Sequence, residues 1–161
     1  MVSEKNLVLS LEEILDFDYS NKNILIIGNA GTGKTWLSKK ICNGTHIKVH
    51  TDDFIPMGYE QAAYSAIEAA MNIIGRSCTE GIQGFRMLRK GYEESTYKPD
   101  IVIHIEISSA KQEEIYRSER DPNKIAGVKA QNKANTTILN KYFDMVPVEE
   151  LPLFIHFNNS Y

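Results

Sequence analysis

The fold of this chain is decided by residues 24–35, which read Ile24-Leu25-Ile26-Ile27-Gly28-Asn29-Ala30-Gly31-Thr32-Gly33-Lys34-Thr35. The stretch opens with four consecutive apolar residues, a pattern typical of a strand that is buried on both faces of a sheet. A glycine-rich loop follows, and residues 34–42 have the composition of a helix that ends near Asn43 and Gly44. A buried strand, a glycine-rich loop and a helix in this order predict an α/β fold.

Residues 28–35 match the phosphate-binding pattern GxxxxGK[ST] at every required position. In such a loop, glycines let the backbone curl so that successive N–H groups point at phosphate oxygens. The helix that begins there adds the positive end of its dipole. We therefore expect this loop to bind a nucleoside triphosphate together with Mg²⁺. Lys34 would reach the β- and γ-phosphates, and the Thr35 hydroxyl would hold the metal ion.

Strand and helix patterns alternate along the rest of the chain. We expect helices at residues 10–17 (opened by a capping box), 60–71 (continuing toward 74), 83–90, 111–120 and 124–143. Further strands are expected at residues 46–51, 76–80, 101–107 and 153–157. About five strands separated by helices predict a single P-loop NTPase domain over residues 1–161, with a mostly parallel sheet.

The composition sets limits on partners and location. The chain has 161 residues and a net charge of −3, which argues against broad affinity for nucleic acid or for anionic membranes. The N-terminus lacks the long apolar core of a signal peptide, and no stretch approaches a membrane span, so we expect a cytoplasmic protein without membrane contact. Cys42 and Cys78 form no CxxC pair, and we expect two reduced, buried thiols.

The strand expected at residues 46–51 runs into His50-Thr51-Asp52-Asp53-Phe54. Here the chain resembles small-molecule P-loop kinases of the uridine kinase, nicotinamide riboside kinase and gluconate kinase type. The resemblance implies an adenylate-kinase-like fold, with Asp52 as the general base and Asp53 supporting Mg²⁺ or the acceptor. Independently, a carboxylate that ends a parallel strand can face the γ-phosphate. The alternative for both aspartates is a helix cap or a solvated loop.

Thr79-Glu80-Gly81 resembles the Glu-Gly that ends the third strand of these kinases. The resemblance implies that Glu80 contacts Mg²⁺, usually through water. The preceding residues 75–79 are less apolar than in the family, so a solvated turn is the alternative. Glu106, at the end of the apolar strand expected at 101–107, is a competing acid.

Two pairs of arginines have the i, i+3 spacing that puts both side chains on one face of a helix. Arg86 and Arg89 are candidates to clamp an acceptor phosphate. Arg117 and Arg120 resemble the pair that closes a lid over the phosphates in these kinases, within a lid-like region at 117–127. Such arginines would stabilise charge that develops during phosphoryl transfer. For each pair the alternative is a solvated helix face with ordinary ion pairs.

These observations predict a phosphotransferase whose partners are ATP and a small-molecule acceptor, with a nucleoside or nucleotide as first choice on family grounds. An alternative acceptor is a hydroxymethylated base, or an end, in DNA. A different class is a P-loop NTPase switch without an acceptor; a Ras-type GTPase is excluded because no NKxD motif follows the loop. His50 and His104 show no metal-ligand spacing, and we expect structural roles for both.

Overall fold

Six parallel strands form one sheet in the computed structural model, which describes residues 5–42, 44–73 and 76–159. The strand order is β1-β6-β5-β2-β4-β3. The bounds are β1 Asn6–Val8, β2 Ile24–Gly28, β3 Ile47–His50, β4 Ser77–Glu80, β5 Ile101–Glu106 and β6 Leu153–Asn158. The five expected strands are confirmed. The sixth, β1, was not expected because a segment of three residues is too short to show an alternating pattern.

The expected helices are also present, with small shifts of their ends. They are α1 Leu11–Asp16, α2 Lys34–Ile41, α3 Tyr59–Met71, α4 Gly84–Glu93, α5 Ser109–Ser118 and α6 Ile125–Met145. Short 3₁₀ segments cover Thr51–Met57, Pro122–Lys124 and Val148–Glu150. The capping box at α1 is confirmed by reciprocal hydrogen bonds of Ser10 with Glu13. The expected continuation of α3 to Ile74 lies outside the described residues.

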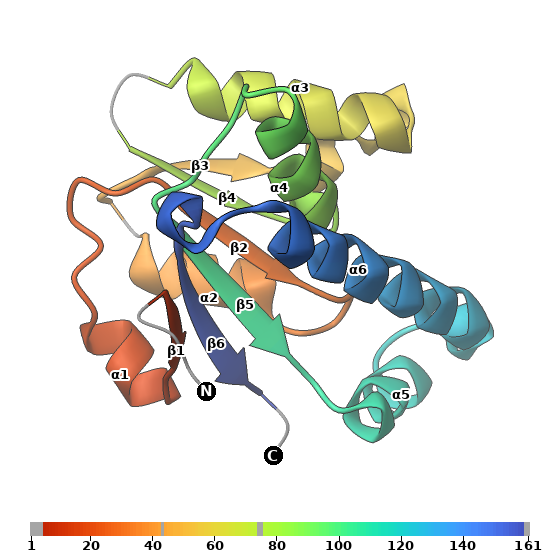
Figure 1. Cartoon of the computed structure of the whole chain (residues 1–161). Coiled ribbons are helices and arrows are strands. Elements are labelled where there is room, and N and C mark those ends of the chain that lie inside the picture. Colours follow the sequence, from red (N-terminus) through yellow and green to blue (C-terminus); the bar gives the residue numbers. More distant parts are fainter. Residues whose placement is uncertain (1–4, 43, 74–75, 160–161) are drawn as a thin grey trace.

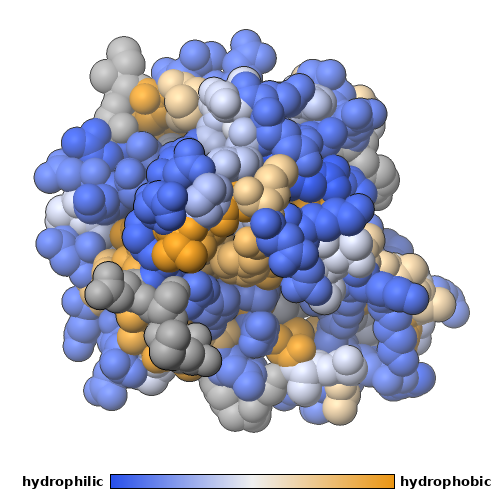
Figure 2. Space-filling model, in the orientation of Figure 1, coloured by the Kyte–Doolittle hydropathy of each residue, from blue (hydrophilic) through white to orange (hydrophobic). Residues whose placement is uncertain are grey.

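The sheet lies between two layers of helices (Figure 1), with α3, α4 and α6 on one face and α1 and α2 on the other. Leu25, Ile27 and Phe154 belong to the core under the first layer. Ile24 and Ile26 belong to the core under the second. Every residue of β2 is buried, as its apolar run predicts. Hydrophilic residues cover most of the face seen in Figure 2, and apolar residues gather near its middle.

β4 is buried although its sequence, Ser77-Cys78-Thr79-Glu80, is poorly apolar. It lies between β2 and β3. Ser77 donates from its N–H and its hydroxyl to Asn23 Oδ1, at 2.9 and 3.1 Å, and Glu80 accepts from the Thr35 hydroxyl. These hydrogen bonds at the two ends of the strand offset part of the cost of burying its polar side chains.

Cys42 and Cys78 form a disulfide, with 6.5 Å between their Cα atoms. The expectation of two separate reduced thiols is therefore wrong. Cys42 ends α2 and Cys78 lies in β4, and the packing of α2 against the sheet brings the two residues together. Residues far apart in sequence gave no sign of this pairing.

The carboxyl end of β2 lies at a topological switch point of the sheet. β4 and β3 lie on one side of β2, whereas β5 and β6 lie on the other. Ligands of open α/β sheets bind beyond the carboxyl ends of the strands at such a point. Within the described residues, no helix has the length and apolar character needed to cross a membrane.

Candidate nucleotide-binding site

The loop between β2 and α2 has the backbone that its glycines predict. Gly31 and Gly33 have φ angles of 81° and 98°, in the left-handed region that favours glycine. A Cβ on Gly28 would lie 2.6 Å from Thr32 Oγ1 and 2.9 Å from the Ile105 carbonyl oxygen. Gly33 is the N-cap residue of α2, and it has no side chain that could accept a hydrogen bond from the first N–H groups of the helix. The first N–H groups of α2 are therefore oriented for an anionic ligand.

Lys34 begins α2 and its side chain lies inside the site. The residue is 8% exposed, and its Nζ donates to the Asn29 carbonyl oxygen at 2.8 Å. Burial lowers the pKa of Lys34 to about 8, while the nearby acids Glu80 and Asp52 act in the opposite direction. The ammonium group is held against the loop, where phosphates would approach.

Four side chains form a cluster beside Lys34. The Thr35 hydroxyl lies 3.2 Å from each carboxylate oxygen of Glu80, which is 4% exposed. His50 Nδ1 contacts Glu80 Oε1, and His50 Nε2 lies 3.6 Å from Asp52 Oδ2. Glu80 is thus a buried acid in contact with the P-loop threonine, not part of a solvated turn. The expectation of a purely structural His50 missed its place between the two acids.

A cavity of about 330 Å³ opens at this point, at the carboxyl ends of β2, β3 and β4. It is lined by Ala30, Gly31, Gly33, Lys34, Thr35, Trp36, His50, Asp52, Glu80, Gly81, Ile82 and Arg120. Loop residues, two carboxylates and one arginine therefore face the same space. The indole of Trp36 is 44% exposed and lies at the cavity.

The predicted arginines and acids separate into two groups. Arg120 lines the cavity and lies over the Tyr116 ring, with its Cζ 5.5 Å from the ring centroid. Arg117 instead donates to Glu113 at 2.7 Å, because α5 ends at Ser118 and the two arginines do not share a helix face. Among the remaining predicted site residues in the described chain, those that do not line the cavity are Gly28, Asn29, Thr32, Asp53, Arg86 and Arg89.

Arg86 and Arg89 make contacts along their own helix. Arg86 donates to Gln83 Oε1 at 3.2 Å, and Arg89 Nε lies 3.8 Å from Glu93 Oε1. Asp53 is exposed in the 3₁₀ segment after β3. Glu106, the competing acid, lines a different cavity beside His104. Glu80, rather than Glu106, is therefore the acid in contact with Thr35.

A buried polar network supports the P-loop from α5 and α6, and sequence reasoning missed it. Gln112 donates to the Ala30 carbonyl oxygen at 2.7 Å, and Asn135 donates to Asn29 Oδ1 at 3.0 Å. Asn132 connects the two helices by donating to Gln112 Oε1 at 2.6 Å. Asn159, after β6, donates to the Thr32 carbonyl oxygen at 2.9 Å. The only signal in the sequence was polar residues at helical spacing on a face that packs inward.

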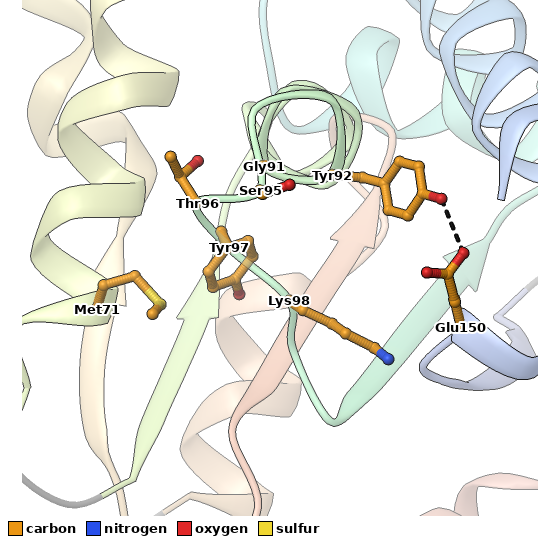
Figure 3. A pocket seen from close by; sticks show the side chains of 8 residues that line it. All are labelled: Met71, Gly91, Tyr92, Ser95, Thr96, Tyr97, Lys98 and Glu150. Carbon is orange, nitrogen blue, oxygen red and sulfur yellow. Dashed lines mark hydrogen bonds between the residues drawn. The ribbon is translucent and has the colours of Figure 1, made fainter.

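A larger cavity of about 610 Å³ lies at the opposite end of the sheet (Figure 3). It is lined by Met71, Gly91, Tyr92, Ser95, Thr96, Tyr97, Lys98 and Glu150. These residues precede β4, β5 and β6 in the chain, so they lie at the amino ends of the strands. Tyr92 donates its hydroxyl to Glu150 at 3.0 Å. No glycine-rich phosphate-binding loop of the described chain lines this cavity, and it lies at the end of the sheet opposite to that where ligands of open α/β sheets bind.

The comparisons with known proteins agree with this geometry at the level of class. No protein-family model matches the chain. The ATP-dependent protease ATPase subunit HslU of Enterococcus faecalis (strain ATCC 700802 / V583) is 35% identical over 74 residues, covering 41% of this chain. The chain matches 16% of that protein's length. The parallel sheet, the GxxxxGK[ST] loop and this similarity together indicate a P-loop NTPase.

Proposed function

We propose that this protein is a small ATP-dependent phosphotransferase of the P-loop kinase type. One observation carries the proposal: a single cavity contains the phosphate-binding residues Lys34 and Thr35 and the separate carboxylate of Asp52. Binding a triphosphate needs only the loop, whereas transfer to an acceptor hydroxyl also needs a group that accepts its proton. The similar protein is named an ATPase subunit, which favours ATP as the donor.

The residues present fit Mg²⁺. The Thr35 hydroxyl and the buried Glu80 carboxylate bring oxygen atoms within 3.2 Å of each other, and oxygen is the ligand that this hard cation prefers. Thr35 would hold the ion directly, and Glu80 would hold it through water. When bound, Mg²⁺ would neutralise charge on the β- and γ-phosphates. Lys34 and the N–H groups at the start of α2 would bind the same phosphates.

Asp52 is proposed as the general base. Its side chain is 49% exposed, and the residue lines the cavity. The acceptor oxygen would attack the γ-phosphorus while its proton passes to Asp52, and the bond to the bridging oxygen of ADP would break. Arg120, from the lid-like region, would stabilise the charge that develops on the transferred group. If the acceptor is itself a phosphate, it needs no base, and Asp52 would only position it.

A nucleoside or nucleotide is the acceptor that we propose. The exposed indole of Trp36 lines the cavity together with Asp52, and an aromatic face is suited to stack on a planar base. A hydroxymethylated base in DNA shares this chemistry and belongs in the same test. Arg86 and Arg89 form no part of the proposal, because the cavity's lining does not include them.

Hydrolysis of ATP without a small acceptor is the second candidate, and the similarity to an ATPase subunit favours it. In that case water would be the nucleophile, and Asp52 would activate or orient it. The two candidates share the P-loop and differ only in where the γ-phosphoryl group goes.

The deciding experiment follows the label from γ-labelled ATP with Mg²⁺ in the presence of nucleosides, nucleoside monophosphates, small polyols or hydroxymethylated DNA. Label is expected on one acceptor class. Asp52→Asn should slow transfer to a hydroxyl by ~10²–10⁴-fold while ATP still binds, the usual contribution of a general base. Asp144→Asn, an exposed aspartate at the end of α6, is the matched control and should transfer normally.

Label released only as inorganic phosphate would reject the kinase proposal and support the hydrolytic candidate. Transfer that is equally fast in wild type and Asp52→Asn would remove Asp52 from the mechanism but would leave the kinase assignment standing.

A further inference from the structure

His104 and His156 lie opposite each other on neighbouring strands. They are Cα partners in the parallel register of β5 and β6, so their side chains project from the same face of the sheet. The two Nδ1 atoms face each other at 3.3 Å. Phe154 stacks against the His156 ring and Phe85 meets the His104 ring edge-on, which restricts both imidazoles.

Glu106 adds a carboxylate to this pair. It follows His104 by two residues in β5, and alternation along a strand therefore places it on the same face. Its Oε1 lies 3.6 Å from His104 Nδ1. One ligand atom from each of His104, Glu106 and His156 lies within 4.8 Å of the other two.

Asn6 determines which nitrogen of His156 carries the proton. Asn6 Oδ1 lies 2.8 Å from His156 Nε2. Because an amide oxygen can only accept, Nε2 donates, and in a neutral imidazole the lone pair is then on Nδ1. That lone pair points toward His104 Nδ1 and the carboxylate. A partner on the far nitrogen is how metal-binding histidines are usually oriented.

We propose that His104, Glu106 and His156 form a binding site for a divalent transition metal ion of the zinc class. Two imidazoles and one carboxylate are a ligand set that zinc takes. Zn–N bonds of about 2.0–2.1 Å in tetrahedral geometry require ligand atoms about 3.3–3.4 Å apart. The distances of 3.3 and 3.6 Å between the ligand atoms agree with that requirement.

The site has room for a fourth ligand. His104 and Glu106 line a cavity of about 380 Å³ together with polar residues, among them Ser108 and Thr136. Three protein ligands with an open position are the arrangement that leaves a bound metal accessible to water or to a small molecule. Asn29 of the P-loop lines the same cavity, so the metal site adjoins the nucleotide loop but uses none of the residues proposed to bind Mg²⁺.

Zn²⁺ binding to the full chain, after treatment with a chelator and dialysis, tests the proposal. Calorimetry should give one strong site, and Co²⁺ should give the visible absorption of a tetrahedral ion. Glu106→Gln should lower the affinity for Zn²⁺ by at least about 100-fold. Asn6→Ala should lower it by ~10–100-fold, as loss of an outer-shell partner does. Because Glu106 is more than half exposed, its variant is expected to fold. His156→Gln tests the second ligand.

Two controls separate this site from other places where zinc could bind. His46→Gln removes a histidine at the other edge of the sheet, and Glu80→Gln removes the acid of the P-loop cavity. Both should retain the strong site. The proposal is overturned if wild type binds no Zn²⁺, if Glu106→Gln and His156→Gln bind it as wild type does, or if Glu80→Gln alone abolishes binding. Failure of ATP turnover would not bear on this result.

Discussion

The two ends of the sheet have cavities of unlike size and chemistry. The cavity at the carboxyl ends of β2, β3 and β4 is about 330 Å³, and its lining includes Lys34, Asp52, Glu80 and Arg120. The cavity at the amino ends is nearly twice as large, about 610 Å³, and its charged side chains are Lys98 and Glu150. Only the smaller one lies beyond a glycine-rich loop and a helix N-terminus, where phosphate oxygens meet backbone N–H groups.

Volume favours the cavity at the amino ends, whereas the GxxxxGK[ST] motif favours the cavity at the carboxyl ends. The parallel topology brings the loop after β2 and the acids after β3 and β4 to one edge, whereas the other edge receives the residues that lead into strands. Each cavity is lined by a lysine and a glutamate. A tightly packed glycine is also found at each end: Gly91 lines the larger cavity, and Gly28 lies in the loop that leads to the smaller one. Matched substitutions at the two ends therefore isolate the effect of position.

The largest difference is expected between the two lysines. Lys34→Met should lower ATP turnover by about 10²–10³-fold, as does removal of a group that stabilises transition-state charge. Lys98→Met makes the same chemical change at the amino end and should leave turnover unchanged. Steady-state kinetics gives turnover, and the fluorescence of the single tryptophan, Trp36, reports binding. Equal effects of the two substitutions would refute the assignment of the site.

The two glutamates should differ in their effect on Mg²⁺. Glu80→Gln is expected to raise the Mg²⁺ concentration needed for half-maximal turnover by ~10–100-fold, because outer-shell partners contribute that much to metal affinity. Glu150→Gln should have no such effect, since Glu150 contacts Tyr92 at the other end. The measurement is a Mg²⁺ titration at saturating ATP. An unchanged Mg²⁺ requirement in Glu80→Gln would exclude that glutamate from the metal site.

Substitution of Gly28 or of Gly91 by alanine should lower stability by a similar amount, but only the first should affect function. A Cβ on Gly91 would lie 2.7 Å from Tyr97 Cβ, as close as that on Gly28 to Thr32. Gly28→Ala and Gly91→Ala should each lower the free energy of unfolding by about 1–3 kcal/mol, the usual cost of overpacking. At temperatures where both variants are folded, only Gly28→Ala should lower the affinity for ATP. Thermal denaturation and fluorescence titration check the two parts, and a Gly91→Ala protein with weakened ATP binding would contradict the comparison.

The smallest effect concerns pH. The pKa of Lys34 is about 8 in the nucleotide-free protein because of burial. A bound triphosphate would raise that pKa, so binding above pH 8 takes up a proton and affinity should fall as the pH rises. For one proton the fall is less than about tenfold per pH unit. Lys34→Arg, which keeps its charge, should bind without this dependence. A wild-type affinity that is flat from pH 8 to 10 would contradict the assignment of the pKa.

Before any ligand binds, the same shift affects stability with the opposite sign. The folded pKa of Lys34 lies below its unfolded value of 10.5, so the unfolded chain binds more protons between pH 8 and 10.5. The contribution of Lys34 to stability is therefore unfavourable at neutral pH and becomes less so as the pH rises through that window.

Most of the fold could be predicted from local patterns. The buried run of β2, the glycine-rich loop and α2 follow one another directly, so the P-loop depends on few distant contacts. Four of the six strands follow from apolar runs or alternation. The strand expected at residues 76–80 has little of either pattern, because the polar side chains of β4 have partners such as Asn23 and Thr35 that lie far away in the sequence.

The arginines show where spacing alone misleads. Arg117 and Arg120 were expected on one helix face, but α5 ends at Ser118 and only Arg120 lines the cavity. Gln112 and Asn135 read as ordinary helix residues, yet they hold the carbonyl of Ala30 and the side chain of Asn29. Helix ends and buried polar partners depend on packing between elements, which a local pattern does not record.

The GxxxxGK[ST] loop is specified locally, since its glycines, lysine and threonine depend on backbone conformations within eight residues. The contacts of Glu80 with Thr35, of Cys42 with Cys78 and of His104 with His156 depend instead on how the elements pack. Those pairs join strands and helices that are distant in the chain, and their side chains meet because the parallel register and the helix packing place them together.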